Sequence, residues 1–204
     1  VFATPMRQCH TIRCDNSGTF HFAFVDAKAD GTPGIFYGTS GSAGLSGPTL
    51  VIQTEALNDQ TLSLALDPEG IPTIVWLGGS SFSGVKVYRS SSTGWNASTH
   101  VEDIVSNATG ISRKSAVYDP SGNLVIDVGF RTLRGATTYV YGGVLRSGSN
   151  GMSFEMLWDR DRGPFGGNAM DLDSQGIAHF VVRNIETIFD STGSLYHLRR
   201  NFVS

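Results

Sequence analysis

The sequence has few charged residues. Asp, Glu, Lys and Arg make up 16% of its 204 residues, against about 25% in an average globular domain. The two signs nearly balance, and the formal net charge is −3 at pH 7. This balance gives no reason to expect nucleic-acid binding through bulk charge. Glu and Lys, which favour helices, are scarce, so the composition favours short strands and tight turns.

Long apolar runs and recognised chemical motifs are also lacking. No apolar run approaches the roughly 20 residues that a membrane-spanning helix needs, and no charged and then apolar leader precedes Val1. We therefore expect no membrane span. No phosphate loop, His-Glu-x-x-His pair or Gly-x-Ser-x-Gly elbow occurs. The close carboxylate pairs, such as Asp171 with Asp173, offer too few oxygens for a calcium loop, so we expect no metal and no cofactor.

Only two cysteines occur, Cys9 and Cys14. On one straight strand their Cα atoms would lie about 16 Å apart, whereas a disulfide needs roughly 4.4 to 6.8 Å. A bridge would therefore require a bend between them. The alternative is that Cys14 is a small core residue.

Glycine, by contrast, is abundant, and it takes part in a repeat. The phrase Asp-x-x-Gly begins at Asp15, Asp67, Asp119 and Asp173, at intervals of 67 − 15 = 52, 119 − 67 = 52 and 173 − 119 = 54 residues. Asp accepts hydrogen bonds from the backbone ahead of it and Gly tolerates positive φ, so each phrase is typical of a tight turn. A fixed period of this length indicates a repeat architecture.

Strand-like segments flank each turn. Residues before the turn alternate between apolar and small, as in Leu62–Leu66, and continuous apolar runs such as Thr73–Trp76 follow it. Such runs favour strands that are covered on both faces. In the first unit we expect strands at 9–14, 19–25, 34–37 and 49–53.

Four-stranded units of about 50 residues arranged around an axis are the blades of a β-propeller. We predict one all-β domain over 1–204, with blades at about 9–57, 58–109, 110–165 and 166–204. The fourth unit lacks an outer strand, and Val1–Met6 is predicted to supply it and close the last blade. Alternatively, this segment pairs with another copy to give a homo-oligomer, or with blades outside this sequence.

The repeat also resembles a known family. Its Asp-x-x-Gly phrase is followed by Ile71-Pro-Thr-Ile-Val-Trp76 or Ile177-Ala-His-Phe-Val-Val182, and then by Val85-Lys-Val-Tyr-Arg-Ser90 and Gly94-Trp95. Together these resemble the repeats of sialidase-like (BNR-type) β-propellers over essentially the whole chain. The strict Asp-box, Ser-x-Asp-x-Gly-x-x-Trp, is absent. The resemblance implies a propeller fold in a family of enzymes, lectins and scaffolds that usually have six or seven blades, so a small closed ring and a fragment both stay open.

A candidate binding site follows from this arrangement. The inner strands of a propeller start at one face, where the loops between second and third strands also emerge. The residues predicted to bind a ligand there are Arg7, His10, Asp26, Arg113, Lys114, Arg131, Arg134, Asn168 and Arg183. Most are basic, and guanidinium groups bind carboxylate or sulfate in bidentate geometry. An acidic or sulfated glycan is the expected partner, and solvated loop charges of little consequence are the alternative.

Histidines allow a further hypothesis. His10 is the candidate for a general acid or base, as an enzyme acting on uronic acids would need, although a rim histidine is the simpler interpretation. His21 and His179 occupy one repeat position, which indicates a structural slot. Arg13 and Asp171 are also equivalent, and we expect a salt bridge between them if four blades close.

The sequence therefore favours a binding module for an anionic carbohydrate. Sequons at Asn96 and Asn107 are compatible with a secreted or surface glycoprotein. A glycan-cleaving enzyme, either a sialidase-like hydrolase or a polysaccharide lyase, is the second reading. The third is an assembly subunit joined by strand exchange.

Overall fold

The computed structural model describes residues 10–42, 44–53, 62–77, 85–92, 94–100, 108–112, 115–134, 137–149, 151–160, 166–183 and 195–201. These residues form 17 strands, β1 to β17, joined by turns. The all-β prediction is therefore confirmed. Within the same residues, no helix is long and apolar enough to cross a membrane.

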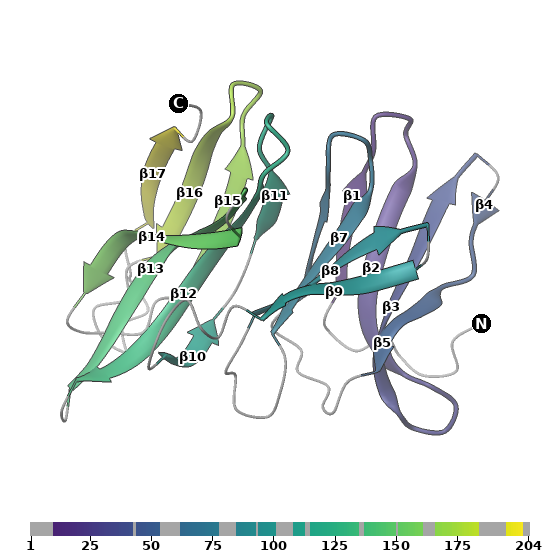
Figure 1. Ribbon diagram of the computed structural model, residues 1–204, viewed down its shortest axis with the longest axis horizontal. Helices are drawn as coiled ribbons and strands as arrows, with labels where there is room; N and C mark the ends of the chain where they lie inside the picture. The colour runs from purple at the N-terminus through teal and green to yellow at the C-terminus, as the bar shows by residue number, and fades with distance from the viewer. Residues whose placement is uncertain are drawn as a thin grey trace. The chain divides into compact units, whose positions relative to one another are not determined.

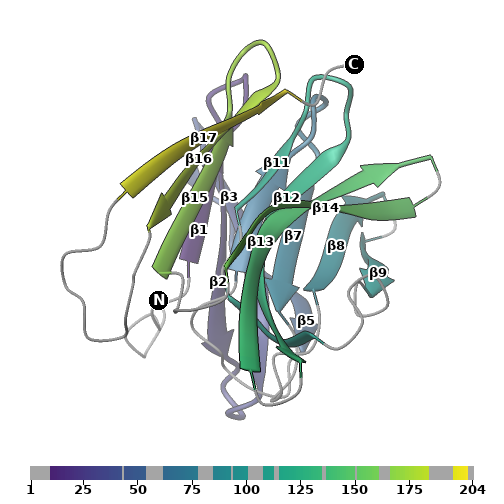
Figure 2. The same ribbon diagram turned by 90° about the vertical axis from the view of Figure 1, so that its left-hand side faces the viewer.

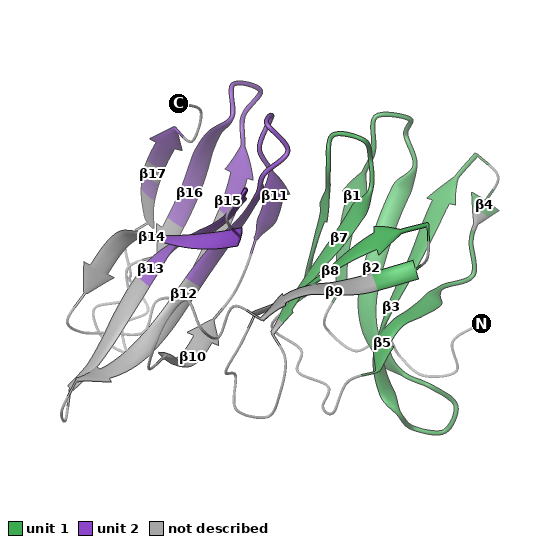
Figure 3. Ribbon diagram, in the orientation of Figure 1, with its two compact units in different colours: residues 1–80, 84–100 green, residues 81–83, 101–204 purple. Residues whose placement is uncertain are grey.

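The chain divides into two compact units, each with two antiparallel sheets (Figure 3). The first unit comprises Val1–Ser80 and Gly84–His100, and the second comprises Ser81–Ser83 and Val101–Ser204. A single domain over 1–204 remains a prediction.

The first unit holds the first and second sheets (Figure 1). The strands of the first sheet are β1 (His10–Cys14), β2 (Phe20–Ala27), β3 (Pro33–Gly41), β4 (Gly44–Leu45) and β5 (Thr49–Gln53), of which β4 and β5 both pair with β3. The second sheet is the meander β6 (Leu62–Leu66), β7 (Pro72–Leu77), β8 (Val85–Ser91) and β9 (Gly94–His100). The four strands expected in the first unit correspond to β1, β2, β3 and β5.

The second unit holds the third and fourth sheets. The strands of the third are β10 (Ala108–Ser112), β11 (Ala116–Tyr118), β12 (Leu124–Arg134), β13 (Thr137–Gly148) and β14 (Gly151–Arg160), with β10 and β11 both on β12. The fourth sheet is the meander β15 (Gly166–Leu172), β16 (Ile177–Arg183) and β17 (Leu195–Asn201), which Figure 2 shows. Because β10 starts at Ala108, the third sheet begins two residues before the predicted blade boundary. Val1–Met6 lies outside the described residues.

Each unit has a core between its two sheets. In the first unit the clustered residues are Ala23, Val25 and Ile35 of the first sheet and Leu64, Ile74, Trp76 and Tyr88 of the second. In the second unit they are Val125 and Val144 of the third sheet and Met170, Ala178 and Phe180 of the fourth. The strands after two of the turns consist of buried residues at Thr73–Trp76 and Leu124–Val128, as the continuous apolar runs predicted.

The outer face of the first sheet, turned away from the second, is more exposed than the equivalent faces of the second and fourth sheets. Ile12 is 55% exposed, whereas the equivalent Leu64 and Met170 are 0% and 4% exposed. Phe20, on the strand beside it, is 49% exposed. Cys14 is likewise exposed and has a free thiol. Its interpretation as a core residue is therefore wrong, because its alternation on β1 places it on this outer face.

The Arg13–Asp171 salt bridge, expected if four blades close, stays a prediction. Arg13 is paired with His21 and so shares the face of Ala23, which packs on the second sheet. Asp171 alternates with Met170, whose side chain packs toward the third sheet, so Asp171 is on the other face. The two residues belong to different units.

Candidate functional site

The four Asp-x-x-Gly phrases form hairpin turns of the same geometry. In each turn the Gly N–H donates to the Asp carbonyl at 2.8 to 3.1 Å. The glycines Gly18, Gly70, Gly122 and Gly176 have φ between 76° and 83°, a region that residues with a Cβ avoid. The turn signal read from the sequence is thus confirmed at all four sites. We call this end of each sheet the turn end, and the opposite end the far end.

One carboxylate oxygen of each Asp closes its own turn. In the first turn, Asp15 Oδ1 accepts hydrogen bonds from Ser17 N at 2.9 Å, Thr19 N at 2.8 Å and Ser17 Oγ at 2.7 Å. The Oδ1 atoms of Asp67, Asp119 and Asp173 accept from the backbone N–H groups two and four residues on in the same way.

The second oxygen binds a basic side chain. Asp119 Oδ2 accepts from Arg146 Nη2 at 2.6 Å and Nε at 3.2 Å, and Asp67 Oδ2 accepts from Arg89 in the second sheet. In the first and fourth sheets the partner is a histidine, His21 Nε2 at 3.3 Å from Asp15 and His179 Nε2 at 3.0 Å from Asp173. The prediction that His21 and His179 share a structural slot is confirmed.

Each of these histidines also forms a hydrogen bond with a third side chain through its other ring nitrogen. His21 Nδ1 lies 2.6 Å from the hydroxyl of Tyr37, and His179 Nδ1 lies 3.0 Å from His197 Nε2. Burial and the nearby Asp15 charge raise the pKa of Tyr37 to about 12. Tyr37 is therefore a proton-bearing phenol at neutral pH and is poorly suited to act as a base.

The carboxylates of Asp15, Asp119 and Asp173 are held ionised by their partners. Hydrogen bonds from Ser17, Thr19 and His21 lower the pKa of Asp15 to about 2. Those from His179 and Ile177 lower the pKa of Asp173. Burial acts to raise the pKa of Asp119, but hydrogen bonds from Asn123 and Arg146 outweigh it and the pKa stays below its usual value. These carboxylates stabilise turns and are too acidic to donate a proton near neutral pH.

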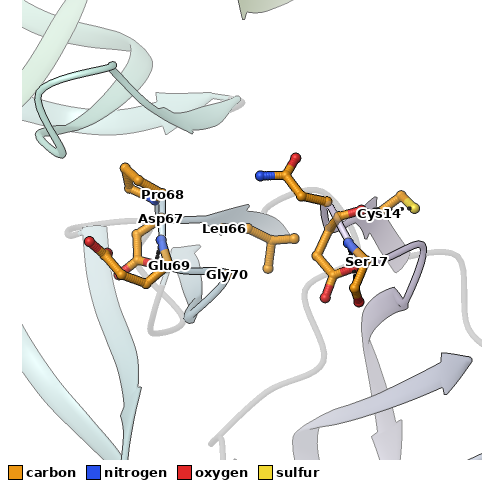
Figure 4. A pocket seen from close by; sticks show the side chains of 9 residues that line it. Cys14, Ser17, Leu66, Asp67, Pro68, Glu69 and Gly70 are labelled. Atoms are coloured by element: carbon orange, nitrogen blue, oxygen red, sulfur yellow. Dashed lines mark hydrogen bonds between the residues drawn. The ribbon is translucent and has the colours of Figure 1, made fainter.

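A cavity of about 350 Å³ lies between the turns of the first and second sheets (Figure 4). Its lining is contributed by Cys14, Asp15, Asn16, Ser17, Leu66, Asp67, Pro68, Glu69 and Gly70. Figure 4 shows Leu66 lying between the Cys14–Ser17 side and the Pro68–Gly70 side. The volume is at the lower end of the range for small-molecule sites. This cavity could not be predicted from the sequence, since it depends on how two turns 52 residues apart pack side by side.

Several residues of the predicted binding site lie toward the far ends of their strands instead. His10 begins β1 and is exposed. Arg131 and Arg134 lie in the second half of β12, and Arg183 ends β16. Asn168 lies in β15 near its start. The strand register places these residues away from the turns, although only His10 has a described side chain. Arg131, Arg134 and Arg183 were expected in loops, and that part of the prediction is wrong because β12 and β16 continue through them.

The remaining predicted residues are Arg7, Arg113, Lys114 and Asp26. Arg7, Arg113 and Lys114 lie outside the described residues. Asp26 was expected in a loop, but β2 continues through it to Ala27, and Asp26 is only 3% exposed. Its Oδ1 accepts a hydrogen bond from Ala27 N at 2.8 Å. The prediction that Asp26 lies in an open loop is wrong, because the pairing with β3 runs two residues further than the apolar run. In the described part of the chain, no group of three or more His, Cys, Asp or Glu is placed to hold a metal ion.

No protein-family model matches the chain, and no curated protein matches it in sequence. Solved structures do resemble it. A protein of unknown function from Dyadobacter fermentans is 10% identical, with a TM-score of 0.67 over 95% of this chain and 65% of that chain. An ulvan lyase, a polysaccharide lyase bound to -[GlcA(1-4)Rha3S]-, is 13% identical, with a TM-score of 0.55 over 95% of this chain and 56% of that one.

An α-L-arabinofuranosidase from Podospora anserina, in complex with cellotriose, is 12% identical, with a TM-score of 0.52 over 95% of this chain and 63% of that chain. This chain therefore spans less than two thirds of the length of each of the three proteins. The lyase and the arabinofuranosidase are β-propeller proteins that act on glycans. At such low identity the likeness supports a propeller fold and carries no function over.

Proposed function

We propose that this chain is a carbohydrate-binding β-propeller module that recognises an anionic glycan at the far ends of its strands. The observation that carries the proposal is the register of the second unit. It places Arg131 and Arg134 toward the end of β12 and Arg183 at the end of β16, all away from the turn carboxylates. Arg113, Lys114 and Asn168, which belong to the same unit, are proposed to complete the site.

The chemistry of arginine explains the choice of ligand. A guanidinium group presents a planar fork of donors that matches a carboxylate or sulfate. The ulvan lyase of similar fold is bound to -[GlcA(1-4)Rha3S]-, a glycan with both kinds of group. That likeness supports a propeller scaffold for anionic glycans without assigning the same ligand to this chain.

Retention on acidic polysaccharide resins, compared with neutral ones, tests the proposal. We expect retention that weakens as salt is raised, because charged contacts are screened. Arg134→Gln should weaken retention, whereas Arg200→Gln should not, since Arg200 forms an exposed pair with Glu155 at 2.6 Å. Equal retention on neutral resin, or an equal loss in both variants, would count against the proposal.

A glycan-cleaving enzyme is the second candidate, and the exposure of His10 at the far end of β1 favours it. An exposed imidazole can serve as a general acid or base. New reducing or unsaturated ends in the same incubations, lost in His10→Ala, would establish cleavage. Polysaccharide that is retained without being cleaved would instead favour the binding module.

The finer architecture belongs to the same proposal. We propose a secreted or surface protein in which Val1–Met6 completes the fourth blade of a closed ring or joins a second copy. The open outer face of the first sheet supports a further covering layer, because the equivalent column is buried in the second and fourth sheets. A monomeric mass in solution would exclude the second copy.

A further inference from the structure

The cavity between the first two turns has a chemistry unlike that of the far ends. Two of its carboxylates, Asp15 and Asp67, are already bound by their own turns and by His21 and Arg89. These partners fix both carboxylates in place. What the cavity can offer must come from the remaining lining residues.

Two of those residues carry unused hydrogen-bonding groups. Asn16 and Glu69 line the cavity and are exposed. Within the described part of the chain, neither the Asn16 carboxamide nor the Glu69 carboxylate makes a hydrogen bond. The backbone of Glu69 is nevertheless fixed, because its N–H donates to Asp67 Oδ1 at 3.0 Å. An acceptor and a mixed donor–acceptor group are thus presented from two ordered turns.

The cavity also has apolar lining residues, and its charge is negative. Leu66 lies between the two sides of the cavity (Figure 4), and Pro68 also lines it. The Glu69 carboxylate has no positive partner among the lining residues, and Asp15, with a pKa of about 2, stays ionised at any working pH. An anion would meet like charges at close range and is disfavoured there.

We infer that this cavity binds a neutral sugar residue, with Asn16 and Glu69 hydrogen-bonding its hydroxyl groups and Leu66 and Pro68 contacting its C–H face. A carboxylate and a carboxamide suit neighbouring hydroxyls, which both donate and accept. The volume of about 350 Å³ accommodates one ring. The inference rests on the proposed carbohydrate function, but it concerns the turn end and a different class of sugar.

Saturation-transfer NMR on the full chain tests the inference with methyl α-mannoside, methyl β-galactoside, methyl β-xyloside and the anionic methyl glucuronide as probes. At least one neutral glycoside should receive saturation, and the glucuronide should not compete with it. Glu69→Gln and Asn16→Ala should each weaken that binding roughly tenfold, since a hydrogen bond to a charged or desolvated group is lost.

The third and fourth turns provide matched controls. Ser121 and Gln175 stand at the turn position of Glu69, and their N–H groups bind Asp119 and Asp173 in the same way. Ser121→Ala and Gln175→Ala should leave glycoside binding unchanged, and equal melting temperatures would show that all variants fold.

Two outcomes would overturn the inference: no saturation of any neutral glycoside, or binding that survives both cavity variants. Acidic-resin retention is measured separately, on the same samples. Retention without glycoside binding would reject only the cavity site. Glycoside binding at the cavity without acidic retention would reject only the anionic site.

Discussion

The Asp turns of the second and third sheets differ from those of the first and fourth in the group that binds the carboxylate. Where the partner is arginine, the Asp side chains are buried, at 2% exposed for Asp67 and 0% for Asp119. Where it is histidine, they are 20% exposed for Asp15 and 33% for Asp173. A buried carboxylate needs a permanent charge with several donors, whereas a hydrated one tolerates an imidazole.

The four turns nonetheless receive their partner at one place in the sheet. His21 and His179 stand on the second strand, six residues after the turn Asp. At the same position the other two sheets have Thr73 and Val125, and the residues paired with these on the third strand are Arg89 and Arg146. The repeat thus preserves the location of a basic group and not the residue that supplies it.

The largest effect should come from removing a buried carboxylate. Asp119→Ala deletes the acceptor of two backbone N–H groups and of the Asn123 and Arg146 side chains. We expect a loss of about 3 kcal/mol in the free energy of unfolding, because a buried charge and several donors lose their partner. Urea denaturation followed by circular dichroism measures this loss.

The comparison variant is Asp173→Ala, at the same turn position in the same unit. Its carboxylate is partly hydrated, so we expect a clearly smaller loss. Equal losses in the two variants would show that the burial of the turn carboxylate has no bearing on its contribution.

A smaller effect should come from removing the guanidinium group alone. Arg146→Met keeps much of the aliphatic stem and leaves Asp119 with its turn donors, so we expect a loss of about 2 kcal/mol. Arg200→Met removes the exposed pair with Glu155, for which about 0.5 kcal/mol is expected. Thermal unfolding of both variants tests the difference, and a comparable shift in melting temperature would contradict it.

The sequence was sufficient to predict the elements that depend on local chemistry. The Asp-x-x-Gly turns and the strands beside them follow from Asp bonding to the backbone ahead and from glycine at positive φ, and the structure has both in all four sheets. Cys14 was misjudged for a related reason. Alternation on β1 fixes which residues share a face, but it does not say which face is covered.

The arginine partners could not be predicted, because they depend on hairpin length. Arg89 follows Asp67 by 89 − 67 = 22 residues, whereas Arg146 follows Asp119 by 146 − 119 = 27. The hairpin of β12 and β13, with strands of 11 and 12 residues, is longer than that of β7 and β8, with 6 and 7. A fixed spacing therefore finds the histidines and misses the arginines.

The candidate site likewise combines features that could be predicted from the sequence with features that could not. Register could be read well enough to place Arg131, Arg134 and Arg183 at the far ends of their strands. Asp26 was misplaced because a strand end depends on its partner strand. The turn-end cavity was missed because its two sides are local turns, but their adjacency is a tertiary property.

The smallest effect concerns acid. The folded-state pKa of Asp15 is lowered from 3.8 to about 2, so the unfolded chain binds the proton more readily. Asp15 therefore contributes stability that is fully present above pH 4 and is lost as pH falls through about 2. We expect the melting temperature to decline as pH is lowered through this window, and to decline less steeply in Asp15→Asn, whose amide does not titrate. An identical slope in the variant would mean that the His21-bound turn gains nothing from its charge and is held by the backbone hydrogen bonds alone.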